Sequence, residues 1–266
     1  MSLKHTERLI NLKAQLYQEV QTACQDLLKT HPIAEPARKY LQTRINSTTN
    51  QNLFDLGYFP DDEHLDILFE KVSEEKVKAL GLVYPYHVQN GDHRVFINKG
   101  MLSNHNLTMP YRDIYGNIRA LVGRTILPEE ERKTQKLQKY KYTRFTKSLH
   151  LFGLYQAKNA VIKKNSVVLV EGQIDCITCH EYGIHNVVAL GGVSLSKRQF
   201  QLLSRYAEKF YLLLDNDLEG KKAQQRIIKR YGKSALFESL ELPTRYKDVD
   251  EYLRSGHQES RILDLV

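Results

Sequence analysis

The feature that most constrains the fold is a regular alternation of short aliphatic runs and helical stretches between residues 161 and 255. The runs are rich in β-branched residues, as buried strands are, and the stretches between them have helical periodicity. This alternation predicts parallel strands joined by right-handed helical crossovers, with helices on both faces of the sheet. We therefore expect a small, doubly wound α/β lobe. Its strands are SVVLV (166–170), NVVAL (186–190), FYLLL (210–214) and a stretch near Ala235–Leu242, and its helices run through Ile174–Tyr182, from Ser196 to Glu208 and over Glu219–Tyr231.

Acidic residues follow three of these strands at the point where each strand ends. Glu171 follows the first strand, Asp215 and Asp217 follow the third, and Asp248 and Asp250 follow the fourth. In an open parallel sheet the ligand site lies beyond the carboxyl ends of the strands, so these acids are expected along one edge. Crowded carboxylates repel one another unless a cation offsets their charge, and carboxylate oxygens suit Mg²⁺ or Mn²⁺. The pattern therefore predicts a divalent metal site. Taken singly, Glu171 could also be a solvent-facing strand end, and the DND triplet a turn with a helix cap.

Upstream of this lobe the sequence pattern changes twice. Apolar residues recur at three- and four-residue steps through residues 3–30, which predicts an amphipathic helix that ends at His31-Pro32. Residues 34–80 continue in helical rhythm, and residues 81–128 contain short β-like pieces. We therefore expect an N-terminal helical segment, a mixed α+β basic subdomain and the α/β lobe, in that order. The expected boundaries are 1–33, 34–160, 161–255 and a short tail at 256–266.

Basic and aromatic residues are interleaved between Arg132 and Lys147. Seven basic residues and no acid fall in this segment, together with Tyr140, Tyr142 and Phe145. Lysine and arginine neutralise phosphates and aromatic rings stack on bases, so the segment suits single-stranded nucleic acid. The net charge of +8 indicates the same kind of partner. The alternative is a solvated, lysine-rich loop.

The cysteines and the apolar pattern set the expected compartment. Cys24, Cys176 and Cys179 are too few for a disulfide framework, so a reducing compartment is expected. No stretch approaches the roughly 18 consecutive apolar residues of a membrane span, and the N-terminus lacks the apolar core of a signal peptide. These features predict a cytoplasmic protein with no membrane partner. Cys176 and Cys179 fall inside a predicted helix and are expected to pack there, with nearby His180 leaving a metal site as the weaker alternative.

Several blocks of this sequence resemble a known family. Glu171-Gly172 with Asp175, ALGG at 189–192, DND with Gly220, and KDVDE at 247–251 look like the Toprim domain, and the last block resembles that of bacterial DnaG-type primases. Upstream, ARKYLQTR with LFDLGYFP, then MPYRDIYGNIRALVGRTI, then KYKYTRF with LFGLYQA resemble blocks of the same primase catalytic core, in the same order. The resemblance covers roughly residues 35–255. Topoisomerases, some nucleases and recombination mediators share the Toprim motifs, so the upstream blocks make primase the more specific match.

The resemblance implies a DNA primase, a nucleotidyltransferase that synthesises short RNA primers on single-stranded DNA in replication. In that family the Toprim acids hold two or more Mg²⁺ or Mn²⁺ ions, which bind the nucleoside triphosphate and assist phosphoryl transfer. Carried over by position, Glu171, Asp215 and Asp217 are the catalytic residues, and these three with Asp248 and Asp250 are the metal ligands. Asp175 matches the second acid of the EGxxD motif, but by its spacing it starts a helix and could cap it instead. The residues expected to contact nucleotide or DNA are Arg112, Arg124, Lys139, Lys141, Arg144 and Lys147. Arg124 could equally pair with a core acid.

The chain also departs from the family pattern. No zinc-ribbon spacing is present and few residues follow Leu253, so the zinc-binding and helicase-binding modules of full-length primases are expected to be missing. Asn104 and Asn106 replace the usual basic pair before MPYRD, and the segment around Lys147 is shorter than the family pattern. We expect a minimal primase, of the kind that a virus or mobile element encodes, that works with a replicative helicase or a zinc-module protein in trans.

Two functions of other classes remain open on the sequence alone. A Toprim nuclease would use the same acids to cleave a phosphodiester bond. A non-catalytic replisome adaptor would bind DNA through the basic segment and a partner protein through the N-terminal helix. Dependence on divalent metal, and on Asp215 and Asp217, separates an enzyme from an adaptor.

Overall fold

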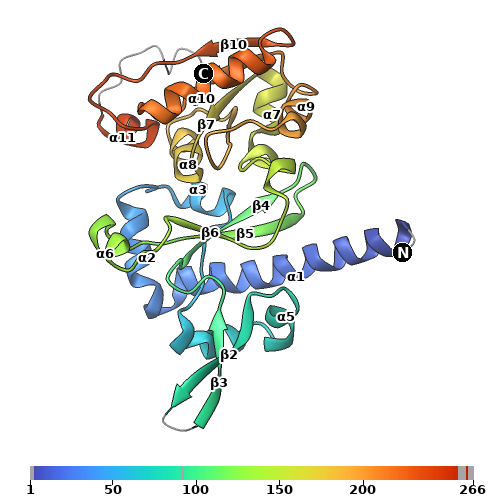
Figure 1. Ribbon diagram of the computed structural model, residues 1–266, viewed down its shortest axis with the longest axis vertical. Coiled ribbons are helices and arrows are strands. Elements are labelled where there is room, and N and C mark those ends of the chain that lie inside the picture. Colours follow the sequence, from blue (N-terminus) through green and yellow to red (C-terminus); the bar gives the residue numbers. More distant parts are fainter. Residues whose placement is uncertain (1–2, 91–92, 257–261, 263–266) are drawn as a thin grey trace. The chain divides into compact units, whose positions relative to one another are not determined.

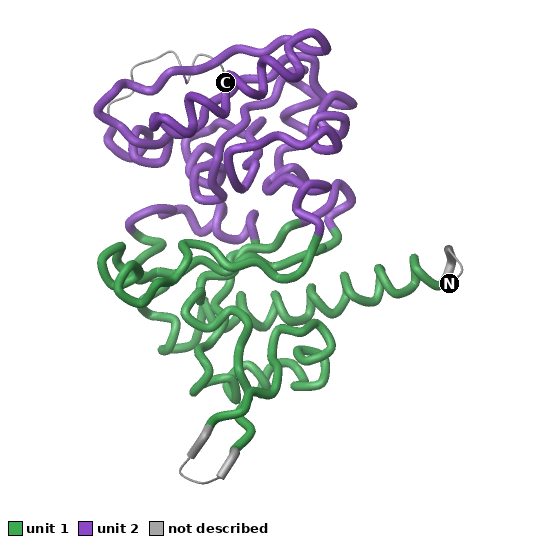
Figure 2. Tube along the Cα trace, in the orientation of Figure 1, with its two compact units in different colours: residues 1–42, 55–111, 117–145 green, residues 43–54, 112–116, 146–266 purple. Residues whose placement is uncertain are grey.

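The structure is a computed structural model that describes residues 3–90, 93–256 and 262. The chain folds into two compact units (Figure 1, Figure 2). The N-terminal unit contains residues 1–42, 55–111 and 117–145, and the C-terminal unit contains residues 43–54, 112–116 and 146–266. This division differs from the expected boundary after residue 160, because the helix that precedes the first strand of the α/β lobe packs in the core of that lobe. The expected tail at 256–266 lies almost entirely outside the described residues.

The N-terminal unit is built on one long helix and an antiparallel sheet (Figure 1). Helix α1 (Leu3–Thr30) is the amphipathic helix that the sequence predicts, and it packs against β1 and β5. The sheet has the strand order β1-β4-β5-β6, and β2 and β3 form a separate two-stranded ribbon. The strands are β1 (Gly57–Tyr58), β2 (Val83–Asn90), β3 (His93–Gly100), β4 (Leu107–Arg112), β5 (Ile118–Arg124) and β6 (Tyr140–Tyr142).

Short helices connect these elements. They are the 3₁₀ turns η1 (Pro32–Ala34), η2 (Asp62–His64) and η3 (Lys147–Leu149), and the α-helices α2 (Glu35–Gln42), α3 (Thr48–Leu53), α4 (Leu65–Phe69), α5 (Glu74–Ala79) and α6 (Glu129–Thr134). Within the described ranges, no helix combines the length and the apolar character that crossing a membrane requires.

The C-terminal unit contains the parallel sheet that the sequence predicts. Its strands pair in the order β10-β9-β7-β8, and all three pairs are parallel. Strands and helices alternate along the chain, so the expected doubly wound α/β lobe is confirmed. The elements are α7 (Leu154–Lys164), β7 (Ser166–Val170), α8 (Gln173–Glu181), β8 (Val187–Ala189), α9 (Lys197–Leu203), β9 (Lys209–Leu212), α10 (Leu218–Tyr231), β10 (Leu236–Ser239) and α11 (Val249–Arg254).

Helices cover both faces of this sheet. On one face, Val167 and Leu169 of β7 share a buried cluster with apolar residues of α7, α9 and α10. The alternate β7 residues, Val168 and Val170, are equally buried but lie outside that cluster, because successive side chains of a strand point to opposite faces. Helix α8 packs against β8 and α11. The continuous aliphatic sequence of β7 is therefore explained by burial on both sides.

The segment 43–54 belongs to the C-terminal unit although it comes early in the chain. Glu181, at the end of α8, accepts hydrogen bonds from Ser47 N at 2.7 Å and from Asn50 Nδ2 at 2.6 Å. Phe54 stacks on Phe152, with ring centroids 5.6 Å apart, and meets the edge of His180 at 4.9 Å. These contacts anchor α3 on α8, a long-range pairing that no local sequence pattern indicates.

The CxxC pair and His180 lie in the core of the C-terminal unit. Cys176 and Cys179 are free thiols with no exposed surface, and burial raises the pKa of both well above its ordinary value. Burial also lowers the pKa of His180 to about 4, and the nearby His185 ring adds to this effect. Cys176 donates to Val187 O at 3.5 Å. The three residues therefore pack a helix, as expected for the pair, and His180 stays neutral at neutral pH.

We expect the buried His180 to make folding depend on pH. The unfolded chain binds a proton at the ordinary pKa of 6.5, whereas the folded chain binds it only near pH 4, so stability falls as the pH drops through this window. The loss should be roughly 3 kcal/mol, because one pKa unit corresponds to about 1.4 kcal/mol. Urea unfolding near neutral pH and at about pH 4.5 should show a smaller pH effect in His180→Leu than in the wild type. The exposed His64→Leu is the control, and a wild-type pH effect in His180→Leu would contradict the prediction.

Candidate active site

Two of the predicted acids lie at the carboxyl ends of adjacent parallel strands. The register of β7 and β9 pairs Leu169 with Leu212, and Leu213 N extends the pairing by donating to Leu169 O at 2.9 Å. This register places Glu171 and Asp215 at the same edge of the sheet. Because β8 lies on one side of β7 and β9 on the other, this is also where the sheet reverses its direction of growth. Doubly wound sheets bind their ligands at such a switch point.

Asn216 joins this edge to the segment that carries Asp248. Its side-chain Nδ2 donates to the carbonyl oxygens of Leu242, Pro243 and Tyr246 at 3.3, 3.3 and 3.2 Å. Its backbone N donates to Lys247 O at 2.7 Å. The loop after β9 is therefore fixed to the chain just before Asp248. We call Glu171, Asp215, Asp217 and Asp248 the acidic edge.

Three of the predicted acids cap helices. Asp217 Oδ1 accepts from Gly220 N at 2.8 Å at the start of α10, and Asp248 Oδ1 accepts from Glu251 N at 2.8 Å at the start of α11. Asp175 Oδ2 accepts from Gly172 N at 2.9 Å, so it caps α8, as its spacing predicts. Each cap uses one carboxylate oxygen and leaves the second outside the cap.

Gly220 lets α10 start directly beside the acidic edge. A Cβ atom at this position would lie 2.0 Å from Asp215 O, a distance that no side chain can adopt. The glycine of the DND…G motif is therefore required by the close approach of the helix to the backbone of Asp215.

Lys147 lies beside Glu171 and supplies a cation next to the acidic edge. Its Nζ donates to Gly191 O, and Gly191 N donates to Glu171 O at 2.9 Å. Burial lowers the pKa of Lys147, and the charge of Glu171 opposes this shift. The structure thus brings one of the predicted nucleotide-binding residues to the acids, within the same unit.

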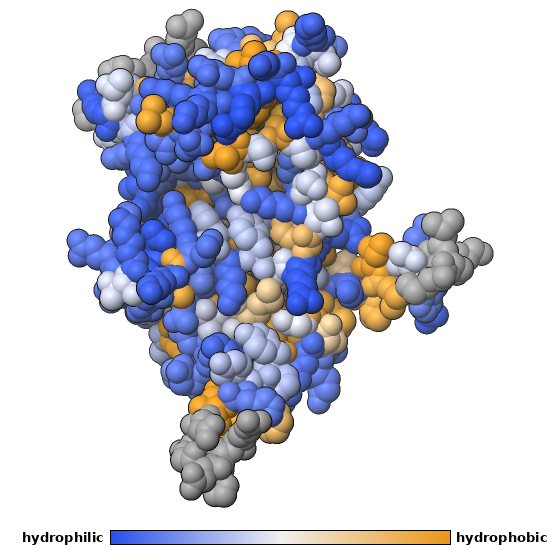
Figure 3. All heavy atoms as spheres, in the orientation of Figure 1, coloured by the Kyte–Doolittle hydropathy of each residue, from blue (hydrophilic) through white to orange (hydrophobic). Residues whose placement is uncertain are grey.

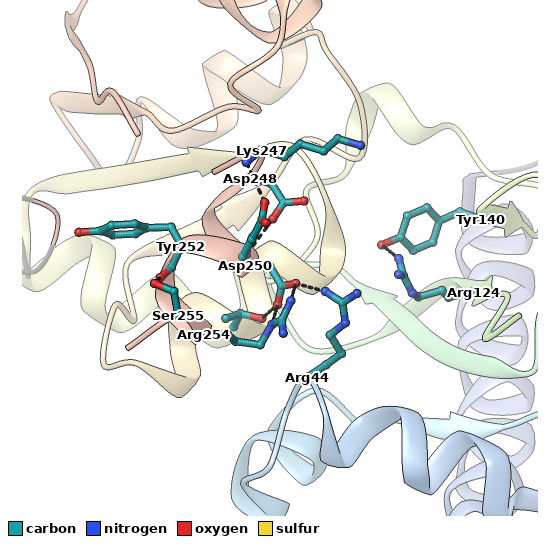
Figure 4. A network of polar contacts seen from close by, with 11 residues as sticks. Arg44, Arg124, Tyr140, Lys247, Asp248, Asp250, Tyr252, Arg254 and Ser255 are labelled. Carbon is teal, nitrogen blue, oxygen red and sulfur yellow. Dashed lines mark hydrogen bonds and ion pairs between the residues drawn. The ribbon is translucent and has the colours of Figure 1, made fainter. Parts of the chain in front are cut away.

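Asp250, which was expected to be a metal ligand, is paired with two arginines in the structure. Figure 4 shows it between Arg44 and Arg254. Oδ1 accepts from Arg254 Nε at 3.0 Å and from Thr178 Oγ1 at 2.8 Å, and Oδ2 accepts from Arg254 Nη2 at 2.9 Å and from Arg44 Nη1. Burial alone would raise the pKa of Asp250, but these partners outweigh it and lower the pKa. An acid that is 2% exposed and already neutralised by guanidinium groups acts as a structural anchor.

The acidic edge fits a divalent ion that is bound together with a phosphate. Among the described residues, no group of three or more His, Cys, Asp or Glu side chains is arranged to hold a metal by itself. Mg²⁺ commonly uses one or two carboxylates and completes its shell with water and substrate phosphates. Glu171, Asp215 and Asp248 are half-buried and Asp217 is exposed, so water and phosphate can reach their oxygens. The donor chemistry therefore suits a hard divalent cation.

Arg124 contacts two tyrosines in the N-terminal unit. Its Nη1 donates to Tyr140 Oη at 2.7 Å (Figure 4). The guanidinium carbon lies 5.1 Å and 5.3 Å from the ring centres of Tyr140 and Tyr40. Burial alone would lower the pKa of Arg124, but the two tyrosines more than offset this effect and raise it. Arg124 is 7% exposed and orients Tyr140, instead of pairing with a core acid.

The other basic residues divide between the two units. Lys139, Lys141 and Arg144 belong to the N-terminal unit, where Lys139 lies 5.9 Å from the ring centre of Tyr140. Lys141 is half-buried on β6, and Arg144 is exposed. Arg112 belongs to the C-terminal unit, and its Nη1 donates to Gly116 O in the following turn. The sequence did not indicate Asn216 as a site residue or Arg44 and Arg254 as partners of Asp250, because none of them has a local signal beyond its position in a motif.

Comparisons with known proteins match both parts of the chain. The family model described as "DNA primase catalytic core, N-terminal domain" matches residues 24–158, and the one described as "Toprim-like" matches residues 168–253. The DNA primase of Synechocystis sp. is 32% identical over 96% of this chain and 41% of the relative. The DNA primase of Lactococcus lactis is 30% identical over 86% of this chain and 34% of the relative. The chain thus spans less than half of the length of these relatives.

Solved structures resemble most of the chain. The structure of the zinc-binding and RNA polymerase domains of the Aquifex aeolicus primase has a TM-score of 0.73 and 26% identity, and covers 94% of this chain and 60% of that one. The structure of a DnaG primase catalytic domain bound to single-stranded DNA has a TM-score of 0.73 and 25% identity, and covers 93% of this chain and 75% of that one.

We predict that Asn216→Ala loosens the segment before Asp248. The change removes three hydrogen bonds to main-chain carbonyls and should lower the free energy of unfolding by about 1–2 kcal/mol. Hydrogen exchange should speed up in residues 242–248. The exposed Asn52→Ala should leave exchange in that segment unchanged. Unaltered exchange in Asn216→Ala would show that other contacts hold the segment.

We predict that Asp250→Asn destabilises the fold without weakening Mn²⁺ binding. The half-exposed arginines limit the loss in the free energy of unfolding to about 2 kcal/mol. Since the folded pKa of Asp250 is lowered, this stability is present above the ordinary value of 3.8 and is lost as the pH falls below it. Asp248→Asn is the matched control, because it makes the same chemical change in a neighbouring acid. It should leave the free energy of unfolding nearly unchanged, since asparagine caps a helix as well as aspartate does. Weaker Mn²⁺ binding with unchanged stability in Asp250→Asn would restore this residue as a metal ligand.

Proposed function

Because the chain belongs to the DNA primase catalytic core family, we propose that it synthesises short RNA primers on single-stranded DNA in DNA replication. The observation that carries this proposal is the register of β7 and β9, which sets Glu171 and Asp215 together at the switch point of the sheet. The reaction is template-directed nucleotidyl transfer, in which a primer 3′ hydroxyl attacks the α-phosphate of a nucleoside triphosphate and pyrophosphate leaves.

The proposed roles follow from the contacts of each acid. Glu171 and Asp215 are proposed as metal ligands and catalytic residues, because they lie on adjacent strand ends and neither caps a helix. Asp217 and Asp248 are proposed to ligate through the oxygen that their caps leave unused. When bound, the divalent ions supply charge neutralisation of the triphosphate and favour loss of the proton from the attacking hydroxyl.

Positive side chains support the same reaction. Lys147 lies beside Glu171, so we propose that it binds a phosphate of the incoming nucleotide. Lys139, Lys141 and Arg144, with Tyr140 and Arg112, are proposed to contact template or nucleotide, since cations and rings together suit single strands. The DnaG primase catalytic domain whose structure was solved with single-stranded DNA is a similar protein that binds such a partner. We further propose that a zinc-binding module, which accompanies the polymerase domain in the Aquifex aeolicus structure, acts with this core.

We predict that Asp215→Asn and Glu171→Gln lower primer synthesis on the order of 100-fold or more, because each removes a charge that the ions require. Binding of labelled single-stranded DNA, measured by anisotropy, should stay within twofold of the wild type. The exposed Asp66→Asn, which makes the same chemical change in the N-terminal unit, should keep full activity.

The assay should measure both de novo synthesis and extension of a preformed primer, with Mg²⁺ and with Mn²⁺. Extension that requires a template and a divalent ion supports the proposal. Cleavage of labelled DNA without nucleotides, in place of extension, would instead identify a Toprim nuclease. DNA binding with no synthesis under either metal would identify an adaptor.

A further inference from the structure

The β2–β3 ribbon carries an apolar face that nothing in the described N-terminal unit covers. In an antiparallel pair, residues directly opposite each other point to the same face. The register pairs Tyr84 with Lys99, Tyr86 with Ile97, and Val88 with Val95. We call these six residues the ribbon face. Its apolar members, Tyr84, Tyr86, Val88, Val95 and Ile97, are 37%, 48%, 37%, 42% and 42% exposed.

The base of the ribbon is firmly held by the unit. Gly100 N donates to Asp62 Oδ1 at 2.7 Å, and Asn98 Nδ2 donates to Glu74 Oε1 at 2.7 Å. Met101 N donates to Leu82 O at 2.7 Å. A two-stranded ribbon is marginally stable in water unless something packs on it. An anchored ribbon with a continuous apolar face is therefore a platform for another molecule, and Figure 3 shows apolar surface where the ribbon leaves the body of the unit.

The surroundings of the ribbon face are basic. Lys99 belongs to the face itself, and its Nζ lies 4.8 Å from the centre of the Tyr86 ring. Tyr84 also lines a pocket of about 780 Å³ whose lining includes the cations Lys13, Lys78, Arg119, Lys141 and Arg144. Of these, Lys78 pairs with Glu74 Oε1 at 2.7 Å. With a net charge of +8, a second copy of this chain would bring like charges together at this surface. The complementary occupant is acidic.

Two kinds of acidic occupant are single-stranded nucleic acid and an acidic protein helix, and the aliphatic side chains favour the helix. Single-stranded nucleic acid binds through rings that stack on bases, whereas three of the five apolar members of the ribbon face, Val88, Val95 and Ile97, are aliphatic. Of the two tyrosines, Tyr86 has Lys99 Nζ 4.8 Å from its ring centre. The pocket wall places aliphatic residues, among them Ile10, Leu80 and Ile118, beside its cations. Branched aliphatic residues beside cations suit a helix with one apolar and one acidic face. We propose that the ribbon face, with Lys99 and the cations of the adjoining pocket, docks an acidic amphipathic helix of a partner protein.

The ribbon face contains none of the residues proposed for catalysis, whereas the adjoining pocket also includes Lys141 and Arg144, which are proposed to contact template or nucleotide. The probe is a fluorescein-labelled, 18-residue helix with leucine at every third or fourth position and glutamate at most others. A scrambled peptide of the same composition and an oligothymidine of similar charge are the comparison ligands. Anisotropy titrations with the full chain should show binding of the helix and at least tenfold weaker binding of the scrambled peptide.

Residue pairs that lie opposite each other in the register give matched double variants, one on each face of the ribbon. Tyr86→Ser with Ile97→Ser alters the ribbon face, whereas His87→Ser with Phe96→Ser alters the opposite face, where Phe96 is 65% exposed. The first pair should raise the Kd for the helix at least tenfold, and the second should change it less than twofold. Lys99→Glu should weaken binding severalfold, whereas Lys29→Glu, at the far end of α1, should not.

Several results would overturn the proposal. They are equal binding of the scrambled peptide, no binding of the helix, or a tenfold loss of oligothymidine binding in the Tyr86/Ile97 variant without a loss for the helix. All substituted side chains are exposed or half-exposed, and far-UV circular dichroism checks that the variants fold. Hydrogen exchange of the unaltered chain is a second test, in which the helix should protect amides of β2 and β3, and a lack of protection also overturns the proposal.

Discussion

The parallel register between β7 and β9 is the constraint on which the rest of the site depends. It sets two acids from distant parts of the sequence on neighbouring strand ends, where their repulsion must be offset by a cation. The backbone hydrogen bonds of the sheet supply the positioning, so the carboxylates are held near each other before any ligand arrives. Asn216 adds to this positioning, because its amide side chain donates to three main-chain carbonyls and holds the segment that carries Asp248 at the same edge.

The acids at this end of the sheet divide into two electrostatic classes. Asp250 is buried and paired with arginines, so it contributes to the fold and leaves little charge for a ligand. The members of the acidic edge are half-buried or exposed, so they retain contact with solvent. Lys147 adds one positive charge beside them. A site of this composition attracts a cation and a phosphate together, which is the charge pattern of a metal–triphosphate complex.

Much of the C-terminal unit is predictable from sequence because its signals are local. The aliphatic runs predicted the strand ends to within three residues, and Ser196, where a helix was expected to begin, caps α9. The positions of the acids at strand ends followed from the same pattern. The pairing of Asp250 with Arg44 was not predictable, since 206 positions separate the two residues. The D-x-D spacing is also the same whether the second aspartate binds a metal or pairs with an arginine. The unit boundaries were missed for a similar reason, as long-range packing assigns residues 43–54 to the later unit.

This interleaving has a consequence for how the chain is made. The N-terminal unit is complete once residue 145 has been synthesised, whereas the C-terminal unit needs both residues 43–54 and α11 near the other terminus. During translation the early segment leaves the ribosome long before its partners on α8 and α11 exist. The first unit can therefore fold while residues 43–54 still lack their partners, and the second can close only after α11 has emerged. Fragments that begin after residue 54 lack a piece of the later unit, so the Toprim-like part cannot be excised cleanly along the linear sequence.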